Sequence, residues 1–448
     1  MRYTPHTPAD KERMLRTIGV AAFEDLIRHI PAELRQNAKI SLPPGLTEVA
    51  VKRRMAALAR QNASAQDWSF FLGGGIYHHA IPSAVDAIIS RAEFATSYTP
   101  YQPEVSQGTL QAMYEFQTLI CQLTGMEVAN AGVYDGASAA AEAVLMARRI
   151  QDGRHRVFVS RALHPQYRQV IATFLRNLVD VELVEVPFTA SGATDVEFLA
   201  RSLDDKAMCA VVGYPNFFGV IEDLALLRAA CDRSGALLAT VTTEPLSLAL
   251  LKPPGAWGAD IAVGEGQSLG VPMSLGGPGF GFFAAQKKFV RSLPGRLVGE
   301  TVDADGRRGF VLTLSTREQH IRREKATSNI CTSQSLCALA STVFMSLLGK
   351  QGMRRLAEVN ARRAHRARER LVKEAGLAPA FTGPHFNEFV LNVGGWAERR
   401  SRFFAKRIVP GIELSPWYPE LPDALLVCVT EMNEEEEIEE LVRTFAGR

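Results

Sequence analysis

The chain has 448 residues, of which 47% are hydrophobic and 22% are charged, as in globular proteins large enough to bury more than one core. Its formal net charge of +2 gives no electrostatic basis for binding nucleic acid. No C-x-x-C pair occurs among the six cysteines, and most of them lie in apolar stretches, so we expect reduced core thiols and a cytoplasmic location. We expect no targeting segment and no membrane span, because no apolar run approaches roughly 18 residues.

The first 70 residues are predicted to form a polar, mostly helical segment, with breaks at Pro31 and at 41–45 (SLPPG). Thr7 followed by a proline and acidic residues predicts a capped helix start. The stretch 71–82 (FLGGGIYHHAIP) is irregular, and its glycines suit positive φ or close backbone approach. His78 and His79 have no further ligands at metal-binding spacing, so we predict no metal site.

Two stretches before the sheet region could carry chemistry. The loop 98–108 (YTPYQPEVSQG) combines polar side chains with stiffening prolines, which suits either ligand contact or a surface loop whose tyrosines pack on the core. After it, apolar residues at three- and four-residue steps over 110–123 predict an amphipathic helix. The turn at Gly136, Ala137 and Ser138 then opens an Ala-rich helix. Its backbone N–H groups could cradle a phosphate or carboxylate, or it could be a tightly packed helix entry that binds nothing.

From residue 156 short apolar strands alternate with helices. Strands are predicted at 156–160, 181–186, 207–214, 236–242, 261–265 and 280–285. This alternation predicts an α/β domain over 71–330, with a mostly parallel sheet covered by helices on both faces. Helices around 333–348 and 351–375 and strands at 388–393 and 424–430 predict C-terminal helices and a small α+β domain over 331–448.

The apolar strand ending near Val263 is followed by a Gly-rich turn (GEGQSLGVPMSLGG, 264–277). Enzymes that bind pyridoxal phosphate often place their Schiff-base lysine just after such a strand and an aspartate on the neighbouring strand. Here the first position holds Gln267 and Ser268, and the strand 236–242 offers Thr240 and Thr242. No Rossmann or P-loop glycine motif is present. Of the lysines nearby, at 252, 287, 288 and 325, none is well placed to form an imine.

Three polar clusters flank the C-terminal helices. The segment 323–335 (REKATSNICTSQS) precedes an apolar helix and could supply an anion contact and a helix cap. The basic stretch 354–371 is interpreted as a solvated helix face, with an apolar stripe at Leu356, Val359 and Leu371. The acidic stretch 433–442 is predicted to start a helix capped by Asn433.

Long motifs of this chain resemble the glycine cleavage system P-protein family. They are 98–131 (YTPYQPEVSQGTLQAMYEFQTLICQLTGMEVANA), 270–284 (GVPMSLGGPGFGFFA) and 323–340 (REKATSNICTSQSLCALA), and 3–15 and 71–82 are also similar. The resemblance implies the aminotransferase-like fold of type I pyridoxal-phosphate enzymes. In its split form the family uses two subunits, and this chain looks like the N-terminal-half subunit, subunit 1.

The resemblance also implies a division of labour. Subunit 2 would hold pyridoxal phosphate covalently, and the assembled enzyme would decarboxylate glycine and pass the aminomethyl group to the lipoyl arm of the H-protein. This chain would complete the active site at the interface. The candidate contacts to the cofactor, to glycine or to the interface are Tyr98, Tyr101, Gln102, Glu104, Ser106, Gln107, Lys325, Thr327, Ser328 and Asn329.

Two alternatives stay open. The chain could be a structural or docking subunit with no residue in the active site. It could also be an independent pyridoxal-phosphate enzyme that uses an unexpected lysine.

Overall fold

The computed structural model describes residues 5–38 and 41–448, which divide into two compact units, 1–64 and 65–448. The first unit contains the helices α1 (Pro8–Ile18), α2 (Phe23–Leu26), α3 (Ala32–Asn37) and α4 (Glu48–Ala59). The predicted start of α1 is confirmed, because the Thr7 hydroxyl accepts a hydrogen bond from the Asp10 N–H and the Asp10 carboxylate accepts one from the Thr7 N–H.

A seven-stranded sheet forms the centre of the second unit, in the order β2-β8-β7-β6-β5-β3-β4. The five strands β3 to β7 are parallel, whereas β8 runs antiparallel to both β7 and β2. Their bounds are β2 Val128–Ala129, β3 Arg156–Ser160, β4 Glu182–Val186, β5 Ala207–Gly213, β6 Leu237–Thr242, β7 Ile261–Glu265 and β8 Gly281–Ala285. The predicted strands and the mostly parallel sheet are confirmed.

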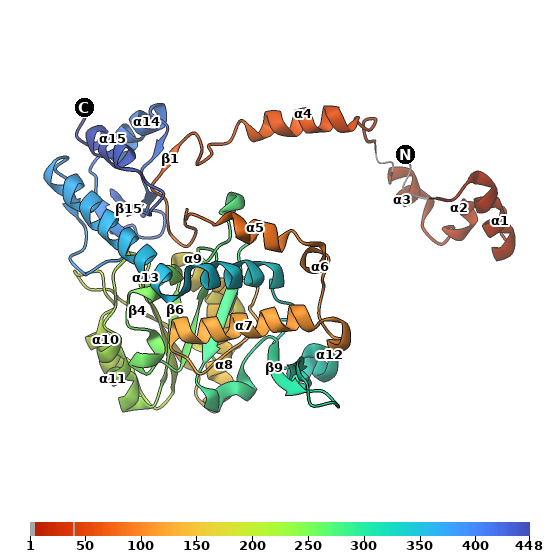
Figure 1. Ribbon diagram of the computed structural model, residues 1–448, viewed down its shortest axis with the longest axis horizontal. Helices are drawn as coiled ribbons and strands as arrows, with labels where there is room; N and C mark the ends of the chain where they lie inside the picture. The colour runs from red at the N-terminus through yellow and green to blue at the C-terminus, as the bar shows by residue number, and fades with distance from the viewer. Residues whose placement is uncertain (1–4, 39–40) are drawn as a thin grey trace. The chain divides into compact units, whose positions relative to one another are not determined.

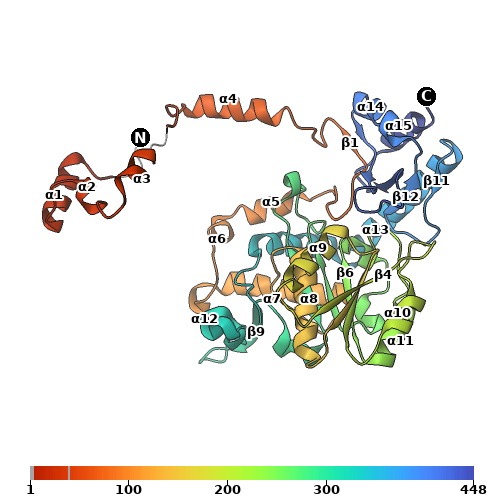
Figure 2. The same ribbon diagram turned by 180° about the vertical axis from the view of Figure 1, so that it is seen from behind.

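Helices cover both faces of this sheet (Figure 1). One face packs on α8 (Gly136–Ile150) and α9 (Pro165–Leu175), which are also visible from behind in Figure 2. The other face packs on α7 (Gln107–Thr124), α10 (Val196–Ser202), α11 (Leu224–Ser234) and α13 (Ser335–Lys373). Alternate residues of one strand serve the two cores: Val157 and Val159 face α8, whereas Phe158 faces α11. The central parallel strands β5, β6 and β7 are therefore buried at every residue, whereas the edge strand β4 exposes Glu182 and Glu185.

Short elements connect these layers. They are β1 (Ser69–Phe70), α5 (Ser83–Ile89), α6 (Ala92–Ala95), η1 (Pro103–Val105), η2 (Pro245–Ala249), η3 (Pro254–Trp257), η4 (Ser274–Gly276), η5 (Lys287–Ser292), η6 (Ser315–Arg317), α12 (Gln319–Arg322) and η7 (Arg323–Lys325). An antiparallel hairpin of β9 (Leu297–Val302) and β10 (Arg308–Thr313), which the sequence did not predict, packs on α7.

The long helix α13 contains one break, at Gly349, whose φ of 61° interrupts the helical backbone where two helices were predicted. In length and composition α13 could cross a membrane, but it packs on α5 and α7 as a core helix does. The predicted apolar stripe of its basic half agrees with the structure at Leu371, which is buried, whereas Leu356 and Val359 are half-buried. The buried residues of this half are Ala357, Asn360, Ala364, Ala367 and Leu371.

The C-terminal part has a four-stranded antiparallel sheet in the order β11-β12-β15-β14. Its elements are β11 (Ala378–Pro379), β12 (Glu388–Asn392), α14 (Trp396–Ala405), β13 (Ile408–Val409), β14 (Ile412–Glu413), β15 (Ala424–Cys428) and α15 (Glu435–Phe445); β13 pairs with β1. The prediction that Asn433 caps the last helix is wrong. Glu434 occupies the N-cap position of α15, and its N–H donates to Glu437 Oε2 at 3.0 Å. The Asn433 side chain instead donates to the Phe70 carbonyl oxygen, a tertiary bond that fixes the chain entering the helix.

Candidate active-site region

The position where a Schiff-base lysine would be expected is built from Gln267 and Ser268, both buried just after β7. The Gln267 Oε1 accepts a hydrogen bond from the Tyr77 N–H at 2.8 Å, and its Nε2 donates to the Tyr77 carbonyl oxygen at 3.1 Å. Ser268 Oγ donates to Glu244 Oε1 at 2.7 Å. Both side chains are therefore engaged in holding the segment 71–82 and the loop after β6, and neither can form an imine.

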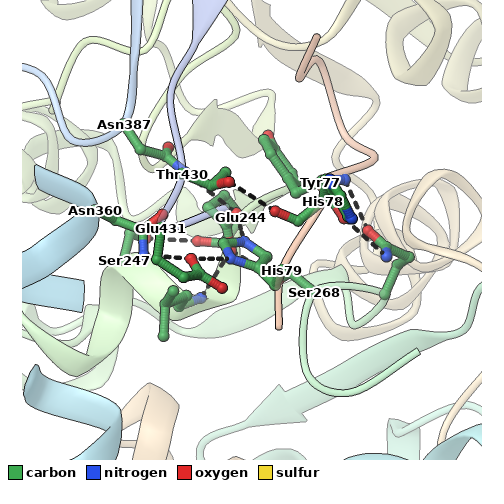
Figure 3. A network of polar contacts seen from close by, with 12 residues as sticks. Tyr77, His78, His79, Glu244, Ser247, Ser268, Asn360, Asn387, Thr430 and Glu431 are labelled. Carbon is green, nitrogen blue, oxygen red and sulfur yellow. Dashed lines mark hydrogen bonds and ion pairs between the residues drawn. The ribbon is translucent and has the colours of Figure 1, made fainter. Parts of the chain in front are cut away.

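Around Ser268 lies a polar network of Tyr77, His79, Glu244, Ser268, Asn387 and Glu431 (Figure 3), most of it buried. Glu388 joins this network through Tyr77. His79 is its centre: its Nε2 lies 2.9 Å from Glu244 Oε2, and its Nδ1 lies 2.8 Å from Glu431 Oε2. Burial alone would lower the pKa of His79, but the two carboxylates raise it to about 10. Burial works to raise the pKa of Glu431, yet His79 lowers it to about 2. The imidazolium is thus a fixed internal cation between two carboxylates.

Glu388 extends the network toward the glycines of segment 71–82. It accepts from Tyr77 Oη at 2.9 Å and from the Gly74 N–H at 2.6 Å, and burial raises its pKa to about 7. A Cβ on Gly73 would come within 2.1 Å of the Glu388 carboxylate, and Gly75 has φ +102°. The predicted need for glycine in this stretch is confirmed, and the sequence did not reveal the carboxylate that imposes it.

The turn at Gly136, Ala137 and Ser138 opens α8 and meets two carboxylates of the chain itself. The Gly136 N–H donates to Glu265 Oε2 at 2.9 Å, and the Ser138 N–H donates to Asp135 Oδ1 at 2.7 Å. Burial raises the pKa of Glu265 to about 7, although N–H groups of Gly136 and Phe280 bind its two oxygens. A Cβ on Gly136 would lie 2.4 Å from Tyr167 Oη, so this helix entry is closely packed.

Next to this turn is a cavity of about 190 Å³, lined by Asp135, His164, Tyr167, Glu265, Gln267 and the glycines at 276, 277 and 279 among others. Burial lowers the pKa of His164 to about 4, so its ring is neutral at pH 7, and it bonds the Gly74 carbonyl oxygen. Among the residues that the structure describes, neither lysine nor arginine lines the cavity.

Pyridoxal phosphate does not fit these residues. A phosphate group here would meet Asp135 and Glu265, which already take N–H groups at the start of α8. On β6 the Thr242 hydroxyl donates to the Tyr214 carbonyl oxygen, and no aspartate stands in its place. The nearby lysines lie elsewhere: Lys252 Nζ is 3.5 Å from the centre of the Trp257 ring, and Lys288 is 61% exposed beside Asp260.

A second group of polar residues gathers where the loop 98–108 meets the segment 315–331. We call Tyr101, Arg296, Glu318, His320 and Cys331 the Arg296 cluster. Arg296 is only 4% exposed; its Nη2 donates to the Cys331 carbonyl oxygen and to Tyr101 Oη at 3.3 Å, and its guanidinium lies 5.4 Å from the centre of the Tyr101 ring. His320 packs edge-on against the same ring, and Glu318 lies 3.9 Å from Arg296 Nε. Arg296 therefore joins two of the predicted motifs.

Sequence reasoning did not find Arg296, His79 as an ion-pair centre, or Glu244. A lone arginine in the otherwise apolar run LPGRLVG (293–299) was the available indication of a buried cation.

The other predicted contacts are placed differently. Tyr98 is 82% exposed, and Gln102, Glu104, Lys325 and Asn329 are also exposed. Gln107 pairs through its side-chain amide with the backbone N–H and carbonyl of Phe310 on β10, which is a structural use. The Thr327 N–H donates to the Arg317 carbonyl oxygen, and Ser328 Oγ accepts from the Ile330 N–H. Ser106 is half-buried at the start of α7.

The predicted cap for the helix after 323–335 is wrong. Among the described residues, the N-cap position of α13 is held by Gln334, whose side chain makes no capping hydrogen bond. Thr327 and Ser328 lie too far upstream to reach the first turn of the helix.

The sheet order, the covering helices and the position of the cavity at the end of β7 define the fold of type I pyridoxal-phosphate enzymes. Solved structures agree: a cysteine desulfurase from Thermococcus onnurineus has a TM-score of 0.64 at 14% identity over 85% of this chain and 94% of its own. A crystal structure of glycine decarboxylase (P-protein) of the glycine cleavage system, in inhibitor-bound form, has a TM-score of 0.89 at 44% identity and covers 100% of both chains.

The family model of the glycine cleavage system P-protein matches residues 1–445, and the chain belongs to this family. A probable glycine dehydrogenase (decarboxylating) subunit 1 from Anaeromyxobacter dehalogenans is 52% identical over 100% of this chain and 99% of its own. The protein of the same description from Carboxydothermus hydrogenoformans is 47% identical over 100% of both. The name of these relatives, subunit 1, implies a separate partner subunit for them.

Proposed function

We propose that this chain is subunit 1 of a glycine dehydrogenase (decarboxylating) and works only together with a second subunit. The observation that carries the proposal is the state of its own lysine position: Gln267 and Ser268 are buried and hydrogen-bonded to the protein. Pyridoxal phosphate, when bound, takes up the negative charge left by decarboxylation. A chain without an imine lysine or a ring aspartate needs a partner that supplies both.

The contribution of this chain to glycine decarboxylation is a wall of the partner's active site. The support comes from the Arg296 cluster, where a buried cation holds the half-exposed Tyr101 and the carbonyl of Cys331 in fixed positions. Side chains held by such contacts can orient a substrate without ordering cost at the moment of binding. Tyr101 is exposed enough to contact a ligand on another chain, and so are Tyr98 in the same loop and Lys325 in the segment 323–335.

The proposed product carrier is the lipoyl arm of the H-protein, as expected for a member of the glycine cleavage system family. The transfer of the aminomethyl group to it would take place on the assembled enzyme.

The test is glycine–bicarbonate exchange, which reports decarboxylation with the H-protein present. Each subunit alone should be inactive, and their mixture should be active. Activity of this chain alone would overturn the proposal in favour of an independent enzyme. Full activity of the mixture after changes at both Tyr101 and Lys325 would favour the docking subunit instead.

A further inference from the structure

The helices of the first unit lack a core of their own. None of the described residues of α1, α2, α3 or α4 is buried. Among the described residues up to position 64, twelve large apolar side chains are 36–79% exposed. Isolated helices of 11 or 12 residues are marginal in water, so these helices need an apolar surface to lie on.

The exposed apolar residues follow helical spacing. On α4, Val51, Met55 and Leu58 recur at steps of four and three and form one face. On α1, Met14 and Ile18 are one turn apart. Both helices begin with a threonine N-cap, Thr7 for α1 and Thr47 for α4, so local hydrogen bonds define where each helix starts. The apolar faces of the two helices are nevertheless not buried within the unit.

We propose that residues 5–38 and 41–64 carry a docking arm, whose apolar helix faces bind the partner subunit. The inference rests on the proposed function in that it takes a second subunit as the occupant. Roughly 400–700 Å² of apolar surface becomes available from twelve half-exposed side chains. That is between half and most of the about 800 Å² that one partner buries in a standard interface.

Charge and backbone stiffness both favour a different chain over a second copy of the arm. Residues 1–64 contain 11 Lys and Arg against 6 Asp and Glu, a surplus of five positive charges, while the whole chain has +2. Two such arms repel each other, so the matching surface is apolar with an acidic rim. Between α3 and α4, Pro43 and Pro44 stiffen a segment without helix or strand, which suits an arm laid along a surface.

The test compares two double variants of the full-length chain. Met55→Gln with Leu58→Gln removes the apolar face of α4 without changing charge, whereas Ala56→Gln with Ala57→Gln adds the same side chains on the opposite side of the same helix. We expect the dissociation constant for the second subunit to rise roughly ten- to hundredfold in the first variant and by less than about twofold in the second. The measurement is sedimentation or titration calorimetry of the two purified subunits.

Three results would overturn the docking arm. Equal dissociation constants for both variants would show that the face of α4 is not used. A lower melting temperature of the isolated chain with unchanged affinity would assign the face to its own second unit. Self-association of the wild-type chain that the first variant abolishes would assign it to a second copy. A wild-type chain that binds no second subunit at all would instead contradict the proposed function, so the two failures are distinguishable.

Discussion

This chain has two groups of buried charged residues, and they differ in what the charges contact: one group is paired entirely inside the protein, and the other supports a side chain at the surface. In the buried network around His79, each carboxylate meets a donor of the same chain, so the charges are satisfied internally. In the Arg296 cluster, an equally buried cation supports Tyr101, which is 52% exposed. The first arrangement closes a region that related folds use for a cofactor. The second arrangement holds the exposed Tyr101 in place at the surface. We therefore interpret the buried charges around His79 as structural and the buried charge of Arg296 as functional.

The largest expected effect concerns His79. Replacing it in His79→Gln leaves Glu244 and Glu431 without their cation, and breaking a buried ion pair in this way costs about 3–5 kcal/mol. Because the folded-state pKa is raised to about 10 from 6.5, the stability that His79 contributes is fully present below pH 6.5 and is lost as the pH rises toward 10. Urea unfolding of the isolated chain across this range measures it.

The matched control is His78→Gln, because His78 is adjacent but lies outside the ion pairs and burial lowers its pKa. We expect little change in that variant. If His79→Gln kept the wild-type stability and the wild-type pH dependence, the network would not be the fixed structural unit described.

The second test concerns the start of α8, where the turn at Gly136 is closely packed. Gly136→Ala puts a methyl group 2.4 Å from Tyr167 Oη and 2.7 Å from the Glu265 backbone nitrogen, so we expect a loss of about 1–3 kcal/mol. Gly108→Ala on α7 has open space around its Cβ and should instead stabilise the chain by about 0.5–1 kcal/mol. Thermal melting of both variants gives the comparison. Equal shifts in both would mean that the entry of α8 has room that the structure does not show.

Arg296→Lys tests the outward-facing region. The charge is kept, but one ammonium cannot reproduce the planar contacts to the Cys331 carbonyl and the Tyr101 ring. We expect the assembled enzyme to lose roughly ten- to hundredfold in turnover through misplaced Tyr101, with a smaller change in the melting temperature of the subunit. Arg291→Lys, in η5 and outside the cluster, serves as the control. Loss of folding without loss of specific activity would assign Arg296 a purely structural role.

Smaller effects are expected at the exposed contacts themselves. Tyr101→Phe removes one hydrogen bond to Arg296, and Lys325→Ala removes an exposed cation, so each should lower turnover several-fold without unfolding the subunit. Lys350→Ala, on an exposed part of α13, is the control for the second change. Unchanged turnover in Tyr101→Phe and Lys325→Ala would contradict the interface wall.

Local pattern predicted most of the fold. The strands from β3 to β8 and the break at Gly349 follow from apolar runs and from a glycine, which depend on neighbours in sequence. The β9–β10 hairpin was missed, because the last three residues of β9, Glu300, Thr301 and Val302, are exposed and the strand lacks the apolar run that marks the other strands. The Asn433 cap failed because its side chain bonds Phe70, which is 363 residues away and cannot be inferred from local spacing.

The site was predictable only where a missing residue type was informative. The absence of a lysine at Gln267 and Ser268 could be seen in the sequence, but what replaces it could not. His79, Glu244 and Glu431 come from segments more than 150 residues apart, and their meeting depends on the packing of the whole second unit. For the same reason Arg296, which joins two recognised motifs, was not identified from either of them.

The most direct test of the division between the two subunits is reductive trapping of the assembled enzyme. Borohydride fixes the imine between pyridoxal phosphate and its lysine, and peptide mass spectrometry then locates the modified residue. We expect a pyridoxyl-lysine in the second subunit and none in this chain, whether it is treated alone or in the complex. A modified lysine at 252, 287, 288 or 325 of this chain would contradict the account.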